Sequence, residues 1–210
     1  MTLEEIRIRL ESVLNPKRFK HSINVMNEAV ELAGVYGENT EKAALAGLLH
    51  DCARGMKGEE IFSACEKYSI LPDNVSKAQP ELLHGVIGTE LAREDYGITD
   101  RTVLNAIRYH TTGRENMELL EKIIFVADYI EPGRDFPGVR EAREIAFTDI
   151  DRAVLLALNR TIEYVLIKGA LIHIDTIFAR NFMINSMKMQ DRPDGDIKVR
   201  PVAISKKGLL

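Results

Sequence analysis

Apolar residues recur along the chain at the three- and four-residue spacing that is typical of helices. A capping-box pair, Thr2 and Glu5, precedes the first apolar face. Between Asn15-Pro16 and Gly37, a predicted helix carries one apolar stripe and a second row that widens it: Phe19, Ile23, Met26, Val30 and Ala33, with Val25, Ala29 and Leu32 beside them. The pattern therefore predicts two amphipathic helices before residue 40.

The same spacing continues to residue 190, and turn residues divide it into further segments. The predicted helices cover residues 41–52 with Thr40 as the cap, 59–68, 81–96, 100–110, 116–130, a short segment ending at 146, 150–168 and 175–189. Alternating runs flanked by hairpin turn signals are absent before residue 190, so no strand is predicted. The sequence indicates one all-α domain over residues 1–190, followed by a tail or arm over residues 191–210.

Composition narrows the classes of function. The 210 residues include 28 basic and 32 acidic side chains, so a broad surface for a nucleic-acid polymer is not expected. No apolar run approaches the roughly 18 residues of a membrane span, and the charged start of the chain does not fit a secretory signal. Cys52 and Cys65 have neither CxxC nor zinc-finger spacing. We therefore expect a cytoplasmic protein without a membrane partner.

Ionisable residues at apolar helix positions carry the candidate chemistry. Four histidines and two carboxylates lie on or at the ends of such segments: His21, His50, Asp51, His84, His110 and Asp128. A buried carboxylate is unfavourable unless it is paired, hydrogen-bonded or bound to a cation. Imidazole and carboxylate ligands together suit iron, manganese, cobalt or zinc. The fifth histidine, His173, is expected to be structural, with Asp175 as a cap of the last helix.

These residues resemble the HD-domain metal-dependent phosphohydrolases, whose pattern places one histidine before a His-Asp pair and an aspartate later in the chain. Further segments are similar to the YqeK-like branch, the bacterial symmetrical diadenosine tetraphosphate hydrolases. The matching segments are Phe19-Lys20-His21-Ser22, His50-Asp51-Cys52-Ala53-Arg54, His84-Gly85, His110-Thr111-Thr112-Gly113 and Ala127-Asp128-Tyr129-Ile130-Glu131-Pro132-Gly133-Arg134. The resemblance implies an all-α HD-domain helical bundle and covers about residues 16–184.

The resemblance also implies a reaction. His21, His50, Asp51 and Asp128 would hold a divalent metal, with iron as the first choice and manganese, cobalt or zinc as alternatives. Water activated by the metal would attack phosphorus directly, with no covalent intermediate. The expected substrate is diadenosine tetraphosphate and the expected product is two ADP molecules. Asp51, His84 and His110 would be the catalytic residues.

Two roles stay open for His84 and His110. They could bind the substrate phosphates or protonate the leaving group, as we expect, or they could hold a second ion, as in two-metal HD phosphodiesterases. The other expected substrate contacts are a set of basic, hydroxyl and backbone groups: Arg54, Gly85, Thr111, Thr112, Gly113 and Arg134.

Two other functions stay open at this point. The chain could be a regulatory HD protein that binds a nucleotide without cleaving it, or a two-metal phosphodiesterase that acts on cyclic dinucleotides. Breadth of substrate and identity of the metal are not determined by these residue types. The Met- and Leu-rich last helix and the arm after Gln190 are candidate contacts of a homodimer.

Overall fold

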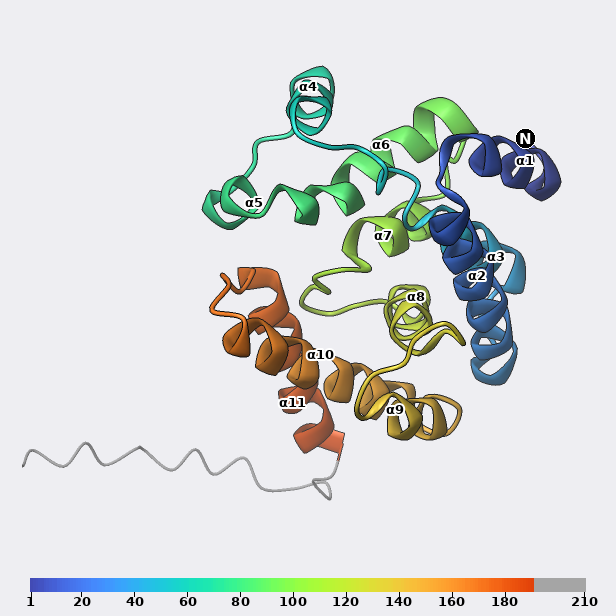
Figure 1. Ribbon diagram of the computed structural model, residues 1–210. Coiled ribbons are helices and arrows are strands. Elements are labelled where there is room, and N and C mark those ends of the chain that lie inside the picture. The colour runs from blue at the N-terminus through green and yellow to red at the C-terminus, as the bar shows by residue number, and fades with distance from the viewer. Residues whose placement is uncertain (191–210) are drawn as a thin grey trace, which may run out of the picture.

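The computed structural model describes residues 1–190, which form helices joined by short loops (Figure 1). The elements are α1 (Leu3–Val13), α2 (Pro16–Tyr36), α3 (Thr40–Leu49), α4 (Glu59–Lys67), α5 (Asn74–Ala78), the 3-10 helix η1 (Pro80–Leu83), α6 (His84–Tyr96), α7 (Arg101–Tyr109), α8 (Leu119–Ile130), α9 (Val139–Ala146), α10 (Ile150–Ile167) and α11 (Ile174–Gln190). Residues 1–190 contain no strand, which confirms the predicted all-α class. None of these helices combines the length and the apolar character that crossing a membrane requires.

Helix α8 is the central element of the bundle. It packs against α2, α3, α7, α9 and α10, and in Figure 1 these helices lie around it. Its sequence is apolar on most sides, as expected of a helix with neighbours all round. Its fully buried side chains include Ile123, Ile124 and Ile130. The helices packed around α8 therefore fix the backbone position of Asp128, near its C-terminal end.

Two glycines allow the helices that carry the histidines to approach closely. A Cβ atom at Gly47 of α3 would lie 2.8 Å from the Cα atom of Met26 in α2. A Cβ atom at Gly85 of α6 would lie 2.6 Å from the carbonyl oxygen of Arg108 in α7. Both distances are shorter than a real Cβ contact, so only glycine fits at these crossings. The glycines thus set the spacing between α2 and α3 and between α6 and α7.

Several local expectations need correction. The fully buried face of α2 consists of the row that we described as widening its stripe, together with Ser22 and one residue of the stripe, Ala33. Phe19, Ile23 and Met26 are only half-buried. The cap of α3 is Asn39, because its side chain accepts from the Lys42 amide. Helix α5 replaces a predicted turn, and the predicted helix over 81–96 is split into η1 and α6. The tail or arm expected over residues 191–210 lies outside the described residues.

The start of α11 also differs from the prediction. The helix begins at Ile174, so Asp175 lies inside its first turn. The capping group is the His173 side chain, whose Nδ1 accepts from the Asp175 amide at 3.2 Å. Its Nε2 lies 2.9 Å from the Asp73 carboxylate. His173 therefore has the structural role that the sequence predicts.

Candidate metal centre

Six polar side chains from five helical segments converge inside the bundle. They are His21 of α2, His50 and Asp51 at the end of α3, His84 at the start of α6, His110 at the end of α7, and Asp128 of α8. All four histidines and Asp51 are buried or nearly so, whereas 22% of the Asp128 side chain is exposed. The structure thus brings together the four predicted ligands and the two histidines whose role was left open.

The first cluster joins the four predicted ligands. The Nε2 atom of His21 lies 3.2 Å from His50 Nε2, 3.1 Å from Asp128 Oδ1 and 3.6 Å from Asp51 Oδ2. His50 Nε2 lies 3.5 Å from the same Asp51 oxygen. Two nitrogens and two oxygens therefore face one point, from which a small cation could contact all of them.

The second cluster lies on the other side of the Asp51 carboxylate. Asp51 Oδ1 is 3.1 Å from His84 Nε2 and 3.7 Å from His110 Nε2, and these two nitrogens are 3.0 Å apart. Thr111 Oγ1 lies 3.1 and 3.0 Å from the same two nitrogens. Asp51 thus presents one oxygen to each pair of histidines, which its position in the sequence alone did not reveal.

Backbone carbonyls determine which nitrogen of three rings carries the proton. Nδ1 of His50 lies 2.7 Å from the Gly47 carbonyl, Nδ1 of His110 lies 2.8 Å from that of Ile107, and Nδ1 of His84 lies 2.5 Å from that of Glu81. A carbonyl only accepts, so each Nδ1 donates, and the neutral ring has its lone pair on Nε2.

The donor set fits a divalent cation. Lone pairs on neighbouring Nε2 atoms repel one another at about 3 Å unless a proton or a metal ion lies between them. Here each such pair also faces a carboxylate oxygen. Three groups, namely His21-His50-Asp51, His50-His110-Asp128 and Asp51-His84-His110, each bring their ligand atoms within 4.8 Å of one another. A divalent cation bound between these atoms would satisfy the lone pairs of either cluster.

The fourth ring depends on Glu131, a residue that sequence reasoning quoted but did not assign a role. Its Oε1 accepts from His21 Nδ1 at 3.1 Å, and its Oε2 accepts from Asn24 Nδ2 at 2.7 Å and from the Gly133 amide at 2.6 Å. A Cβ atom at Gly133 would lie 2.9 Å from both Glu131 oxygens. Burial disfavours the Glu131 carboxylate, yet these donors lower its pKa below the ordinary value.

Electrostatics keep both aspartates anionic. Burial alone would raise the pKa of Asp51, but its contacts with the rings of His50, His110 and His84 hold it well below its usual range. Burial opposes ionisation of Asp128 as well, and its contact with His21 and the charges of His50 and Arg134 lower its pKa strongly. Burial lowers the pKa of His84, which favours its neutral, metal-binding form.

Two arginines lie beside the aspartates. Arg18, which sequence reasoning missed, places Nη1 2.6 Å from Asp51 Oδ2. Arg134, a predicted phosphate ligand, bonds to both the carboxylate and the carbonyl of Asp128. About a third of each arginine side chain is exposed. Arg18 lies one helical turn before His21 on α2, and Glu131 lies one turn after Asp128. This spacing of three residues from a predicted ligand is the sequence feature that could have identified both residues.

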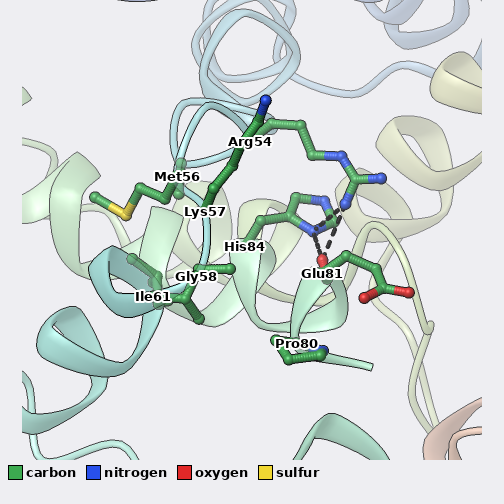
Figure 2. A pocket seen from close by; sticks show the side chains of 10 residues that line it. Arg54, Met56, Lys57, Gly58, Ile61, Pro80, Glu81 and His84 are labelled. Atoms are coloured by element: carbon green, nitrogen blue, oxygen red, sulfur yellow. Dashed lines mark hydrogen bonds between the residues drawn. The ribbon is translucent and has the colours of Figure 1, made fainter. Parts of the chain in front are cut away.

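The remaining predicted substrate residues fall into distinct places. Arg54 donates to the Glu81 carbonyl at 2.9 Å, and the same nitrogen lies 3.0 Å from His84 Nδ1 (Figure 2). The Gly113 amide donates to the Tyr109 carbonyl, so it is not free for a phosphate, which corrects one expectation. Gly85 has a packing role at the crossing of α6 and α7, and a substrate contact there stays a prediction.

Known proteins are similar to this chain in sequence and in fold. Residues 18–133 match the HD domain family. The chain is 37% identical over 185 residues to "Bis(5'-nucleosyl)-tetraphosphatase, symmetrical" of Bacillus subtilis, which covers 88% of this chain and 99% of that one. It is 42% identical to the protein of the same name from Halalkalibacterium halodurans, over 83% of this chain and 93% of the relative.

A solved structure is also similar to this chain in sequence and in fold. It is the crystal structure of a "predicted HD superfamily hydrolase involved in NAD metabolism" from Clostridium acetobutylicum, which is 48% identical to this chain. The two structures have a TM-score of 0.86 over 89% of this chain and 98% of that chain.

Proposed function

The chain belongs to the HD-domain family, and on that basis we propose that it is a metal-dependent hydrolase that splits diadenosine tetraphosphate symmetrically. The observation that carries the proposal is the convergence of the His, His-Asp and Asp residues inside a chain that spans nearly the full length of relatives named for that reaction. Water and the substrate give two ADP molecules: one bridging P–O bond breaks, the water oxygen joins one ADP, and a proton reaches the other.

HD-domain hydrolases bind a divalent metal, and the clusters around Asp51 have the donors for one. We assign His21, His50, Asp51 and Asp128 as its ligands, with iron as the first choice and manganese, cobalt or zinc as alternatives. When bound, the ion would polarise a phosphoryl oxygen and lower the pKa of water. Asp51, which lies between both pairs of histidines, would also orient the attacking water through its carboxylate.

His84 and His110 have two candidate roles, ligation of a second ion and contact with the substrate phosphates. The geometry favours ligation, although the sequence favoured the phosphates. Their Nε2 atoms point at Asp51 Oδ1 rather than toward open solvent, and both side chains are buried. This supports a second ion that shares Asp51 with the first. The alternative is contact with the phosphates or with the departing ADP, in which Thr111 would take part because its hydroxyl contacts both rings.

The substrate phosphates would approach from the exposed edge of the cluster. Arg134 and Arg18 lie there beside Asp128 and Asp51, and their guanidinium groups suit bidentate binding of phosphate oxygens. The hydroxyl groups of Thr111 and Thr112 and the guanidinium of Arg54 are the further candidates. The polyphosphate would thus lie along a row of cations in an otherwise acidic protein.

Product analysis tests the proposal directly. The protein, purified without chelator, should convert diadenosine tetraphosphate to ADP alone, as read by anion-exchange chromatography. AMP and ATP in equal amounts would contradict cleavage at the midpoint. Nucleotide binding without any product would favour the regulatory alternative. Faster cleavage of a cyclic dinucleotide than of diadenosine tetraphosphate would favour the phosphodiesterase alternative.

Metal counting separates the roles of the ligands. Asp51→Asn should lose metal from both clusters, because it removes the carboxylate that both share. Asp149→Asn is the matched control, since asparagine can also cap α10. His110→Ala should lose one of two ions per chain if His110 is a ligand. If it keeps the wild-type metal content while activity falls by roughly 10²–10³, the phosphate role is correct.

We place the homodimer contact on the face of α10 and α11. The large apolar side chains exposed there are Tyr164, Leu166, Ile167, Leu171, Ile174 and Phe178. Exposed apolar side chains in this number are typical of a surface that a partner covers. Met183, by contrast, is a core residue and cannot contribute. Ile167→Glu should shift a dimer to a monomer in gel filtration, whereas Ile8→Glu, on exposed α1 surface, should not.

A further inference from the structure

A cavity of about 310 Å³ lies beside the metal centre, between the α3–α4 connection and the start of α6. Its apolar lining includes Ala53, Ile61 and Ile87, which belong to a small hydrophobic cluster separate from the main core. Met56 packs against the same cluster, and Figure 2 shows its side chain on the same side of His84 as Ile61. Ligand pockets have volumes of roughly 300–1,000 Å³ and mostly apolar walls. This cavity therefore has room for one nucleoside and not for two.

The lining of the cavity has a net positive charge, because two cationic side chains face one carboxylate, that of the exposed Glu81. Arg54 and Lys57 both line it, and within residues 1–190 neither lies in a salt bridge with a carboxylate. The Arg54 contacts are the Glu81 carbonyl and His84, which use one nitrogen of its guanidinium and leave the others for a ligand. An apolar floor with two cations at its edge suits an aromatic base attached to phosphates.

His84 links the cavity to the metal centre. Its Nε2 faces Asp51 and His110, whereas its Nδ1 faces Arg54 and the Glu81 carbonyl on the cavity side (Figure 2). The thickness of one imidazole ring therefore separates the two places. A nucleoside in the cavity would keep its own phosphates close enough to reach the cluster.

A second cavity, of about 500 Å³, is less suited to an anion. Its lining includes three carboxylates, from Asp73, Glu90 and Asp175, against the single arginine Arg108, together with Thr111 and Thr112. Its one histidine, His173, is already used by Asp73 and by the cap of α11. Repulsion by these carboxylates would disfavour a polyphosphate chain there.

We propose that the Arg54–Lys57 cavity is the subsite for the nucleoside of one ADP half of the substrate, with Arg54 and Lys57 on its phosphates. This inference rests on the proposed function for the identity of the ligand. It goes beyond that function by placing one half of a symmetrical substrate in a specific cavity. The other half would then extend over the exposed arginines at the far edge of the metal centre.

Equilibrium binding to the metal-loaded protein tests the subsite, with ADP and inorganic pyrophosphate as probes. Met56→Trp fills the cavity, so the dissociation constant for ADP should rise about tenfold or more while that for pyrophosphate stays within about twofold. Val86→Trp makes the same kind of change in the second cavity and should leave the dissociation constant for ADP unchanged. Thermal melts check that both variants are folded.

A charge variant tests the same subsite without a change in packing. Lys57→Glu should weaken both probes about tenfold, because Lys57 is assigned to the phosphates. The exposed control Lys188→Glu should weaken neither. Weaker ADP binding in Val86→Trp with unchanged binding in Met56→Trp would overturn the inference, as would wild-type protein that does not bind ADP. Binding as expected but without hydrolysis of diadenosine tetraphosphate would instead contradict the proposed function alone.

Discussion

Glu131 does for His21 what a backbone carbonyl does for each of the other three rings, since its carboxylate accepts the proton of Nδ1. A carboxylate in this position orients the ring and raises its basicity toward a metal. The residue is buried and has two further donors, so its own position is well determined. We therefore treat Glu131 as a positioning residue.

Glu131→Gln should lower metal affinity by about 10–100-fold, because the amide no longer carries the charge that supports His21. Metal titration of the apoprotein measures this without reference to activity. Glu121→Gln is the matched control, because Glu121 is another buried glutamate. It lies on α8 and pairs with Arg114 rather than with a histidine of the cluster. Equal losses in both variants would mean that Glu131 has only a structural role.

Gly133→Ala tests the contact between Glu131 and His21 by displacing the carboxylate instead of removing its charge. The new Cβ atom would lie 2.9 Å from the Glu131 oxygens, so the carboxylate should move away from His21 and metal affinity should fall. The double variant Gly133→Ala/Glu131→Asp should recover part of the loss, because the shorter side chain leaves room. Unchanged metal affinity in Gly133→Ala would show that the carboxylate tolerates displacement.

At the scale of single residues, the sequence singled out the six side chains that converge inside the bundle but assigned no role to Arg18 or Glu131, which contact them. The ligands were accessible because a histidine or an aspartate on an apolar face is unusual. Arg18 and Glu131 lie on partly polar helix turns, where such residues are common. Only the fold, which brings positions 110 apart into contact at His21 and Glu131, reveals what they do.

Among the helices, the crossing of α2 and α3 sets the distance between His21 and His50. Gly47→Ala should force the two backbones apart, with a loss of about 1–3 kcal/mol in unfolding free energy and weaker metal binding. Gly34→Ala, on the same α2, meets no atom within 4 Å and should stabilise the protein by about 0.5–1 kcal/mol. Denaturant unfolding measures both, and a loss in Gly34→Ala would contradict the assignment.

The cap of α7 provides a pH-dependent contribution. Lys42 and the Thr102 hydroxyl lower the pKa of Asp100 below its ordinary value, so its ionised form stabilises the fold above about pH 4 and this contribution is lost as the pH falls further. Wild type should exceed Asp100→Asn by up to about 1 kcal/mol at pH 7, since asparagine keeps the cap and loses the charge. The two proteins should converge in unfolding free energy below about pH 4. A constant difference would exclude the charge as its source.

Helix positions followed from the periodic pattern, whereas helix ends and short helices did not. Helix α5 contains five residues and was read as a turn because so short a segment shows no period. The apolar row chosen for α2 was one position away from the buried one, since both rows are apolar and only the neighbouring α3 and α8 decide which is covered.

For the whole molecule, the metal should contribute to stability. The candidate ligands come from different helical segments that meet only in the folded chain, and a metal that binds the folded state alone stabilises that state. Removal of the metal with a chelator should lower Tm, and addition of the metal should restore it. The Asp51→Asn variant should show no such response. A chelator effect of equal size in that variant would place the metal elsewhere.

The membership of the HD-domain family, the all-α class and the hydrolase activity predicted from the motifs are confirmed by the fold and by the relatives. The metal identity, the cytoplasmic location and the domain boundary at residue 190 stay predictions. The metal identity depends on which ions are available, the location depends on the cell, and the boundary depends on residues 191–210. None of the three follows from the packing of residues 1–190.

The carbonyl contacts of His50, His84 and His110 all come from the residue three positions earlier in the chain. These rings are thus oriented once their own helical turn has formed, independently of the tertiary structure. His21 alone waits for a partner 110 positions away. A partly folded chain would therefore have three oriented rings and one free to rotate. Full metal affinity would develop only when the end of α8 packs against α2.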